Sequence, residues 1–313
     1  MRVLITGAAG PRGRLLASRL AAEGHEVVGV ASEPFAEPLT VPAAVHPIRL
    51  LRLDLRQRGF EDLVRRERFD AVCHLAVHAG FRMAASERYR MNMEGSQRVI
   101  ALCAAHGVPR LIVASHAAIY GSLPDNPYFM TEDSPPRVGK AFPEMQDVVT
   151  ADLMAGAAMW KYPSLSIAVL RSVNSLGPTS RDALAVLLRH RYVPTLVGFD
   201  PMTQVIHESD LAKAFSVALT SGIRGVFNVT GPGEVPISVI VREAGCIKVP
   251  LPETLLQAAL GRFGLPDVGE GVLEFLKHPC LLDGSRFATA TGFTPDYDLE
   301  ATLHSVRKER PGA

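Results

Sequence analysis

The stretch MRVLITGAAGPRGRLLASRLAAEGHEVVGV, residues 1–30, decides the fold of this chain. It contains a short apolar run, three evenly spaced glycines at Gly7, Gly10 and Gly13, an apolar-periodic segment and a second apolar run. This order predicts a strand, a glycine turn, a helix and a second strand. A unit of this kind places backbone N–H groups and a helix N-terminus beside a pyrophosphate.

The three glycines have separate roles in this prediction. Gly7 allows the tight turn, Gly10 allows a phosphate to approach the backbone, and Gly13 allows the helix to pack on the strand. A tight turn that binds nothing is the alternative interpretation. The position of the triplet between a predicted strand and a predicted helix favours a dinucleotide site over that alternative.

The composition is typical of a globular protein with a large core. The chain has 313 residues, enough for a large domain and a smaller lobe, and 47% of them are hydrophobic while 21% are charged. A net charge of +1 gives no electrostatic attraction to nucleic acid or to an acidic membrane. No apolar stretch reaches membrane-spanning length, and the first residues suggest a core strand rather than a signal peptide. We therefore expect a cytoplasmic protein with a small-molecule substrate and no nucleic-acid or membrane partner.

No group of His, Cys, Asp and Glu residues has the spacing of metal ligands. The four cysteines are far apart and form no C-x-x-C pair. We therefore expect no metal site.

Strand and helix patterns alternate through the first half of the chain. After the opening unit, strands are expected at 48–53, 71–76, 111–115 and 166–170, and helices at 60–66, 87–106 and 143–160. This rhythm predicts an α/β fold, with a doubly wound parallel sheet covered by helices on both faces. Ligands of such sheets bind at the carboxyl ends of the strands.

From Gly177 the pattern loosens, and Gly and Pro become frequent. We expect a Rossmann domain at 1–177, with 204–231 returning to it, and a mainly substrate-binding lobe at 178–313. The elements expected in this half are a strand at 225–230 and helices at 182–191, 209–220, 237–244, 252–263 and 299–308.

Short motifs follow one another in a fixed order along the chain. They are TGAAGPRG at 6–13, DL at 54–55, HLA at 74–76, NMEGS at 92–96, AIYG at 118–121, LRSVNSLGP at 170–178, VIHESDL at 205–211 and VFNVTGPG at 226–233. Together they resemble the motifs of the extended short-chain dehydrogenase/reductases, the NAD(P)-dependent epimerase/dehydratase group. The resemblance implies a Rossmann fold with a smaller C-terminal substrate lobe. It also implies a homodimer, because the helices expected at 87–106 and 143–160 match those that pair into dimers in this family.

The resemblance and the glycine turn together predict NAD(P) as the cofactor. The candidate cofactor-binding residues are Gly7, Gly10, Pro11, Arg12, Gly13, Ser32, Asp54, Leu55, Leu75, Ala76, Asn92, Ser115 and Asn174. NAD-preferring enzymes carry an acid at the end of the second strand, whereas here Glu33 comes two places late. Arg12 could reach a 2′-phosphate, which favours NADP(H), although Glu33 could still serve NAD.

The catalytic positions depart from the family pattern. His116 stands at the position of the family's Ser or Thr, with Ser115 one residue earlier. Counting back from Arg171 places Glu144 at the position of the family's Tyr and Val148 at that of its Lys. Val148 cannot lower the pKa of an acid/base group, as the family's Lys does. We therefore predict that Glu144 and His116 act as the acid/base pair, since a carboxyl group in an apolar cleft has a raised pKa and imidazole titrates near neutral pH.

These residues also have structural interpretations. Glu144 suits the first turn of a helix, and His116 could cap backbone groups at a strand end. Asn174 and His207 are the candidate substrate-side residues. Arg181, Arg189 and Arg191 could grip a nucleotide diphosphate, or they could be surface charges.

Three functions are compatible with these residues. The first is an enzyme of the epimerase/dehydratase or reductase type that acts on a small hydroxyl or carbonyl substrate, with nucleotide sugars among the candidates. The second is a non-catalytic NAD(P)-binding sensor or scaffold, which the missing Tyr and Lys favour. The third is a non-redox lyase or isomerase on the same fold.

Overall fold

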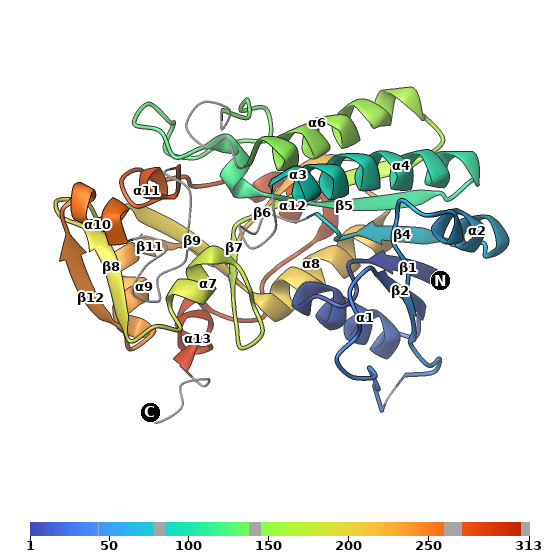
Figure 1. Cartoon of the computed structure of the whole chain (residues 1–313), viewed down its shortest axis with the longest axis horizontal. Helices are drawn as coiled ribbons and strands as arrows, with labels where there is room; N and C mark the ends of the chain where they lie inside the picture. Colours follow the sequence, from blue (N-terminus) through green and yellow to red (C-terminus); the bar gives the residue numbers. More distant parts are fainter. Residues whose placement is uncertain (43, 78–84, 138–144, 260–270, 308–313) are drawn as a thin grey trace.

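The centre of the protein is a seven-stranded parallel sheet (Figure 1). The computed structural model describes residues 1–42, 44–77, 85–137, 145–259 and 271–307. The strands of the sheet are β1 (Arg2–Thr6), β2 (Glu26–Ala31), β3 (Arg49–Arg52), β4 (Ala71–His74), β5 (Arg110–His116), β6 (Ser166–Ser172) and β10 (Gly225–Val229). Their spatial order is β10-β6-β5-β4-β1-β2-β3, so the chain switches direction of winding at β1. The doubly wound parallel sheet predicted from the sequence is confirmed.

Helices cover both faces of this sheet (Figure 1). They are α1 (Pro11–Ala22), α2 (Arg58–Arg66), α3 (Ala85–Arg90), α4 (Ser96–Ala105), α6 (Gln146–Lys161) and α8 (Glu208–Ser221). One core cluster joins Leu16 of α1 to Phe215 of α8, and the opposite cluster joins Phe60 of α2 to Ile100 of α4 and Met159 of α6. Because both faces are covered, the central strands are apolar throughout rather than alternating. Burial of a side chain such as Phe60 stabilises the fold by about 2 kcal/mol.

The helix predicted over 87–106 is not continuous. A π-helical turn, η1 (Met91–Gly95), separates α3 from α4. Within this turn the buried amide of Asn92 donates to Asp147 of α6 over 2.8 Å, and Arg88 of α3 donates to the same carboxylate over 2.9 Å. The wider π-helical turn directs Asn92 toward α6. The apolar spacing of the sequence resumes after this turn, so the periodicity alone does not reveal the extra residue.

The second half of the chain adds a smaller lobe, which lies at the left in Figure 1. Its strands are β7 (Asn174–Leu176), β8 (Tyr192–Leu196), β9 (Met202–His207), β11 (Glu234–Pro236) and β12 (Ile247–Leu251). They form a three-stranded sheet, β11-β9-β7, and a parallel pair, β12-β8. Its helices are α7 (Ala183–Leu187), α9 (Ile237–Glu243), α10 (Glu253–Ala259), α11 (Gly271–Phe275) and α13 (Leu299–His304). The helix α12 (Ser285–Thr291) packs instead on β10 and α8 of the main domain.

Two details of this half bear on the site. The helix predicted over 182–191 is shorter, since α7 spans Ala183–Leu187 and the strand β8 begins at Tyr192. The chain also returns to the main sheet as β10, which pairs in parallel with β6.

No helix among the described residues is both long and apolar enough to cross a membrane.

Two of the glycines in the first turn should respond differently to substitution. A Cβ at Gly13 would lie 2.4 Å from the carbonyl oxygen of Gly7 and 2.6 Å from the Cα of Ala8, whereas a Cβ at Gly10 would meet only the Gly7 oxygen, at 3.5 Å. We expect Gly13→Ala to lower the free energy of unfolding by about 3 kcal/mol, because backbone must move to admit the methyl group. Gly10→Ala should cost less than about 1 kcal/mol. Urea denaturation measures both, and equal losses would contradict this account.

Candidate functional site

The glycine turn lies at the carboxyl edge of the sheet, where β1 and β4 end side by side. Gly7 has φ +74°, a conformation that favours glycine. A Cβ at Gly7 would lie 2.9 Å from the backbone nitrogen of Ala76 and 3.0 Å from the carbonyl carbon of Leu75. The chain after β4 therefore packs directly against the turn, and the predicted residues Leu75 and Ala76 border the same space as the glycines.

A series of buried side-chain hydrogen bonds fixes the strands and the helix beside the glycine turn. The Thr6 hydroxyl lies 2.7 Å from Nδ1 of His74, and Nε2 of His74 lies 2.9 Å from the Ser96 hydroxyl. These contacts join β1, β4 and α4 beneath the glycine turn. Fully satisfied buried hydrogen bonds of this kind hold their elements in one arrangement.

The N-terminus of α1 opens toward the edge of the sheet without a capping side chain. Gly10 is the N-cap residue, and Pro11 is the first helical residue. The backbone N–H groups of the first turn, at Arg12 and Gly13, therefore have no side-chain acceptor from the cap, and the helix dipole adds positive charge there. The open space beside Gly10 and these donors fit the diphosphate of a dinucleotide.

Predicted contacts of the adenosine half lie where β2 and β3 end. Ser32 follows β2, and its carbonyl oxygen accepts from Nε of Arg52 over 3.1 Å. Asp54 accepts from the side chain and the backbone N–H of Arg56, and the side-chain hydrogen bond chiefly lowers the pKa of this carboxyl group. Asp54 is therefore a carboxylate at neutral pH. Leu55 is half-buried against the core under α2 and α4.

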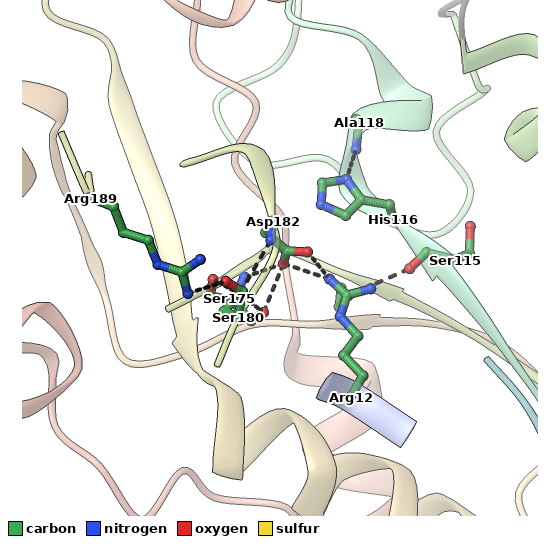
Figure 2. Close-up of polar contacts among 9 residues, drawn as sticks. Arg12, Ser115, His116, Ala118, Ser175, Ser180, Asp182 and Arg189 are labelled. Atoms are coloured by element: carbon green, nitrogen blue, oxygen red, sulfur yellow. Dashed lines mark hydrogen bonds and ion pairs between the residues drawn. The ribbon is translucent and has the colours of Figure 1, made fainter. Parts of the chain in front are cut away.

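The Arg12 side chain, for which the sequence predicted a contact with the 2′-phosphate of NADP(H), is paired with a carboxylate of the second lobe. Its Nη2 lies 2.5 Å from both carboxylate oxygens of Asp182, which precedes α7 in the second lobe. Figure 2 shows the guanidinium directed toward Asp182 and Ser115, at the end of β5. Ser32 lies on the other side of β1, at the end of β2. An ion pair therefore holds this side chain away from the end of β2, and this placement gives no support to the prediction that Arg12 reaches a 2′-phosphate.

Asp182 is the centre of a hydrogen-bonded loop. Its Oδ2 accepts from the backbone N–H of Ser175 over 2.7 Å and from the Ser175 hydroxyl over 2.8 Å. Burial raises the pKa of Asp182, but the charge of Arg12 and the Ser175 hydrogen bonds help to outweigh it, and the pKa lies below its usual range. Arg189, a candidate diphosphate ligand, instead donates to the carbonyls of Pro178 and Ser180 and braces this loop.

His116 ends β5 and caps the 3-10 turn η2 (Ala117–Tyr120). Its Nδ1 accepts from the backbone N–H of Ala118 over 3.0 Å, which assigns the proton of the neutral ring to Nε2. Nε2 has no hydrogen-bond partner within the described part of the chain. Burial lowers the pKa of His116 to about 4, the Asp182 charge raises it in part, and the Arg12 charge lowers it further.

The expectation that this imidazole titrates near neutral pH is therefore wrong. The His116 ring is neutral, and its Nε2–H is a hydrogen-bond donor rather than an acid/base group. A structural role and a binding role of His116 are compatible, because Nδ1 caps the 3-10 turn while Nε2–H can donate to another partner.

The other predicted residues divide into two groups. Ser115 is buried beside His116, and Asn174 starts β7, two residues after the strand that pairs with the end of β5. His207 is occupied elsewhere: Nδ1 accepts from Ser209 N–H over 3.2 Å, and the ring stacks on Tyr297 with centroids 3.6 Å apart. His207 is buried and caps α8, and its place in the substrate cleft stays a prediction.

The two remaining family positions are on or near α6. Glu144 lies outside the described residues. Val148, at the position of the family's Lys, is buried in the first turn of α6. The cation of α6 is Lys161, at the opposite end of the helix. Within the described ranges, no group of three His, Cys, Asp or Glu residues could hold a metal ion.

Comparison with known proteins places the chain among relatives with the same fold. The model of the NAD dependent epimerase/dehydratase family matches residues 3–230. An uncharacterised protein of Mycobacterium tuberculosis is 27% identical over 303 residues, which cover 94% of this chain and 80% of that protein. The UDP-glucose 4-epimerase of Corynebacterium glutamicum is 26% identical over 257 residues, covering 75% and 76%. The structure of Thermus thermophilus UDP-glucose 4-epimerase in complex with NAD matches all of both chains, with a TM-score of 0.76 and 22% identity.

Folding stability should fall as the pH is lowered from about 6.5 to about 4, in part because of His116. The unfolded chain takes up a proton on this ring near its ordinary pKa, whereas the folded protein takes it up only near the lowered one. The difference corresponds to at most about 3 kcal/mol. Urea denaturation across this pH window measures it. His116→Asn keeps an acceptor for the Ala118 N–H and removes the titration, so its stability should depend less on pH, and an unchanged pH dependence would contradict the assignment.

Proposed function

The chain belongs to the NAD dependent epimerase/dehydratase family, and on this premise we propose that it is an NAD(P)-dependent enzyme with a non-standard catalytic centre. The observation that carries the proposal is the neutral His116, whose Nε2–H is left for a partner at the same sheet edge as the uncapped N-terminus of α1. This arrangement supports a bound dinucleotide beside a donor for a substrate oxygen. We expect the enzyme to be cytoplasmic.

The substrate that we propose is a small molecule with a hydroxyl or carbonyl group. A neutral imidazole can donate a hydrogen bond to either oxygen without placing a full charge beside it. Nucleotide sugars are the favoured class, because the Corynebacterium glutamicum relative is a UDP-glucose 4-epimerase. The reaction is then of the epimerase, dehydratase or reductase type.

The roles that we propose divide between two residues. His116 holds and polarises the substrate oxygen through Nε2–H. Glu144, at the position of the family's Tyr, gives or takes the proton, since a carboxyl group can act as a general acid or base. The bound nicotinamide would supply the hydride donor or acceptor.

We propose NADP(H) as the cofactor, with Arg52 in place of Arg12. The chain after β2 runs Ser32-Glu33, so the position directly after the strand carries no acid. Arg52 is exposed at the end of β3 and donates to the Ser32 carbonyl, which places a cation beside that position. A guanidinium binds a phosphate through paired hydrogen bonds.

A non-catalytic NAD(P)-binding sensor is the second candidate. The buried Val148 favours it, because no cation stands where the family's Lys lies. The two candidates share the dinucleotide site and differ in whether substrate is turned over.

The test combines nucleotide binding with turnover. Mass spectrometry of the purified protein should find a nicotinamide dinucleotide, and calorimetry should find NADP(H) bound more tightly than NAD(H), by about 10-fold for one phosphate–Arg contact. Arg52→Ala should remove that preference. With UDP-sugars as probes, Glu144→Gln and His116→Asn should each lower kcat by about 100-fold or more while leaving dinucleotide affinity unchanged.

The outcomes separate the candidates. Dinucleotide binding with no turnover of any sugar nucleotide by the wild type would support the sensor and contradict the enzyme. Unchanged kcat in Glu144→Gln would remove that residue from the proposed roles. Failure to bind either dinucleotide would contradict both candidates.

We also propose a homodimer formed through the outer faces of α4 and α6, which lie side by side (Figure 1). Trp160 is 88% exposed and Leu153 is 51% exposed, and their spacing places them on one face of α6. Ala157, between them, is also exposed. A second copy of the chain would cover this apolar stripe, as the family resemblance implies.

Trp160→Asp should convert the dimer to a monomer in light scattering at micromolar concentration, because a charge would enter a desolvated contact. Tyr192→Asp is the control, since Tyr192 is 55% exposed but lies on β8 of the second lobe. A monomeric wild type would contradict this interface. So would a Trp160→Asp variant that remains a dimer.

A further inference from the structure

The ion pair between Arg12 and Asp182 joins two segments that are 170 residues apart in the sequence. Arg12 comes from the first turn of α1, beside the glycine turn, and Asp182 comes from the loop before α7. Their side chains are 31% and 14% exposed. The pair therefore stands where the cofactor half of the site meets the second lobe, and it is partly withdrawn from water.

The carboxylate of Asp182 accepts hydrogen bonds on both oxygens. Nη2 of Arg12 lies 2.5 Å from both of its oxygens, and Ser175 donates twice to Oδ2. The Ser175 hydroxyl also lies 2.9 Å from the Ser180 hydroxyl, so the loop that carries Asp182 is braced from within. Such a carboxylate has a fixed position and a nearby compensating charge.

His116 is the third member of this cluster. Figure 2 shows its ring at the end of β5, facing the space in which Arg12 meets Asp182. An uncompensated carboxylate near an imidazole favours the protonated ring, which is how an Asp stabilises an imidazolium in hydrolase triads. A guanidinium paired with that carboxylate cancels this effect.

We propose that Arg12 is a positioning residue that neutralises Asp182, so that the buried His116 ring stays in its neutral, Nε2–H-donating form. This inference rests on the proposed function for the use of that donor on a substrate oxygen. The protonation state of the ring itself can be measured without substrate.

The surroundings of His116 contain few other charges. Within the described part of the chain, Arg12 and Asp182 are the charged groups that act on its ring. The neighbouring strand β6 offers the hydroxyl of Ser172, and Arg171 of that strand is paired with the buried Asp152. The Cys280 thiol donates to the Ala117 carbonyl, and burial raises its pKa to about 12, so it stays neutral.

The alternative is that the ion pair only ties the two lobes together. The two accounts differ in what Arg12→Gln does. Loss of a tie lowers stability and leaves the titration of His116 unchanged. Loss of a compensating charge leaves Asp182 as a bare carboxylate beside the ring and raises the pKa of His116 by about one to three units.

The experiment is an NMR titration of ¹³C-labelled histidine Cε1 signals in the full-length protein from pH 8 to pH 5, with His116→Asn used to assign the His116 signal. In the wild type this signal should stay constant across the range. In Arg12→Gln it should titrate within the range, whereas Arg12→Lys should restore the constant signal by returning the charge. In the double variant Arg12→Gln/Asp182→Asn the signal should again be constant, because no carboxylate remains to be compensated.

Three results would overturn the proposal: a His116 signal that titrates near pH 6.5 in the wild type, a constant signal in Arg12→Gln, or the same titration in the single and double variants. If Arg12→Gln does not fold, Asp182→Asn and Arg12→Lys still decide, because a His116 signal that titrates above pH 5 in Asp182→Asn would contradict the role of the carboxylate. A shift in Arg12→Gln together with normal turnover in His116→Asn would uphold this inference and contradict the proposed role of His116 in catalysis.

Discussion

The close approach of the glycine turn to its neighbours is the constraint on which the site depends. Gly13 leaves no room for a Cβ against the Gly7 carbonyl, and Gly7 leaves none against the backbone of Ala76. This contact draws α1 onto β1 and β4 and aims its N-terminus at the sheet edge. Arg12, in the first turn of that helix, is thereby placed within reach of the second lobe.

The placement of Arg12 explains how distant segments form one site. β5 brings His116 to the same edge, and β7 leads into the loop that carries Asp182. Each of the three side chains is fixed by local backbone: Arg12 by the helix start, His116 by the Ala118 N–H, and Asp182 by Ser175. The electrostatics of the cluster then follow from the sheet topology rather than from any one motif.

This origin also explains what sequence patterns could and could not predict. The order of strands and helices and the glycine turn follow from local periodicity, and the parallel sheet was predicted correctly on that basis. The Arg12–Asp182 pair could not be predicted, because its members are far apart in sequence and belong to different motifs. The lowered pKa of His116 depends on burial and on that pair, so the residue type alone suggested the wrong protonation state.

Two other differences have local causes that a motif does not carry. His207 matches a family motif, yet its ring is taken up by the Ser209 N–H and by Tyr297, which lies far along the chain. The π turn at 91–95 leaves the apolar spacing of the flanking helices intact, and its effect appears only through the contact of Asn92 with Asp147. In both cases a tertiary partner decides what a locally ambiguous residue does.

The energetics of the Arg12–Asp182 pair argue that its charge matters more than its strength as a tie. Ion pairs that are partly exposed contribute about 0–1 kcal/mol, since desolvation and side-chain ordering offset most of the attraction. Two packed apolar side chains could join the lobes at least as well. They could not set the potential at a neighbouring imidazole. The charge of Arg12, in the glycine turn, opposes protonation of His116, and this electrostatic effect is one that an apolar contact in its place could not supply.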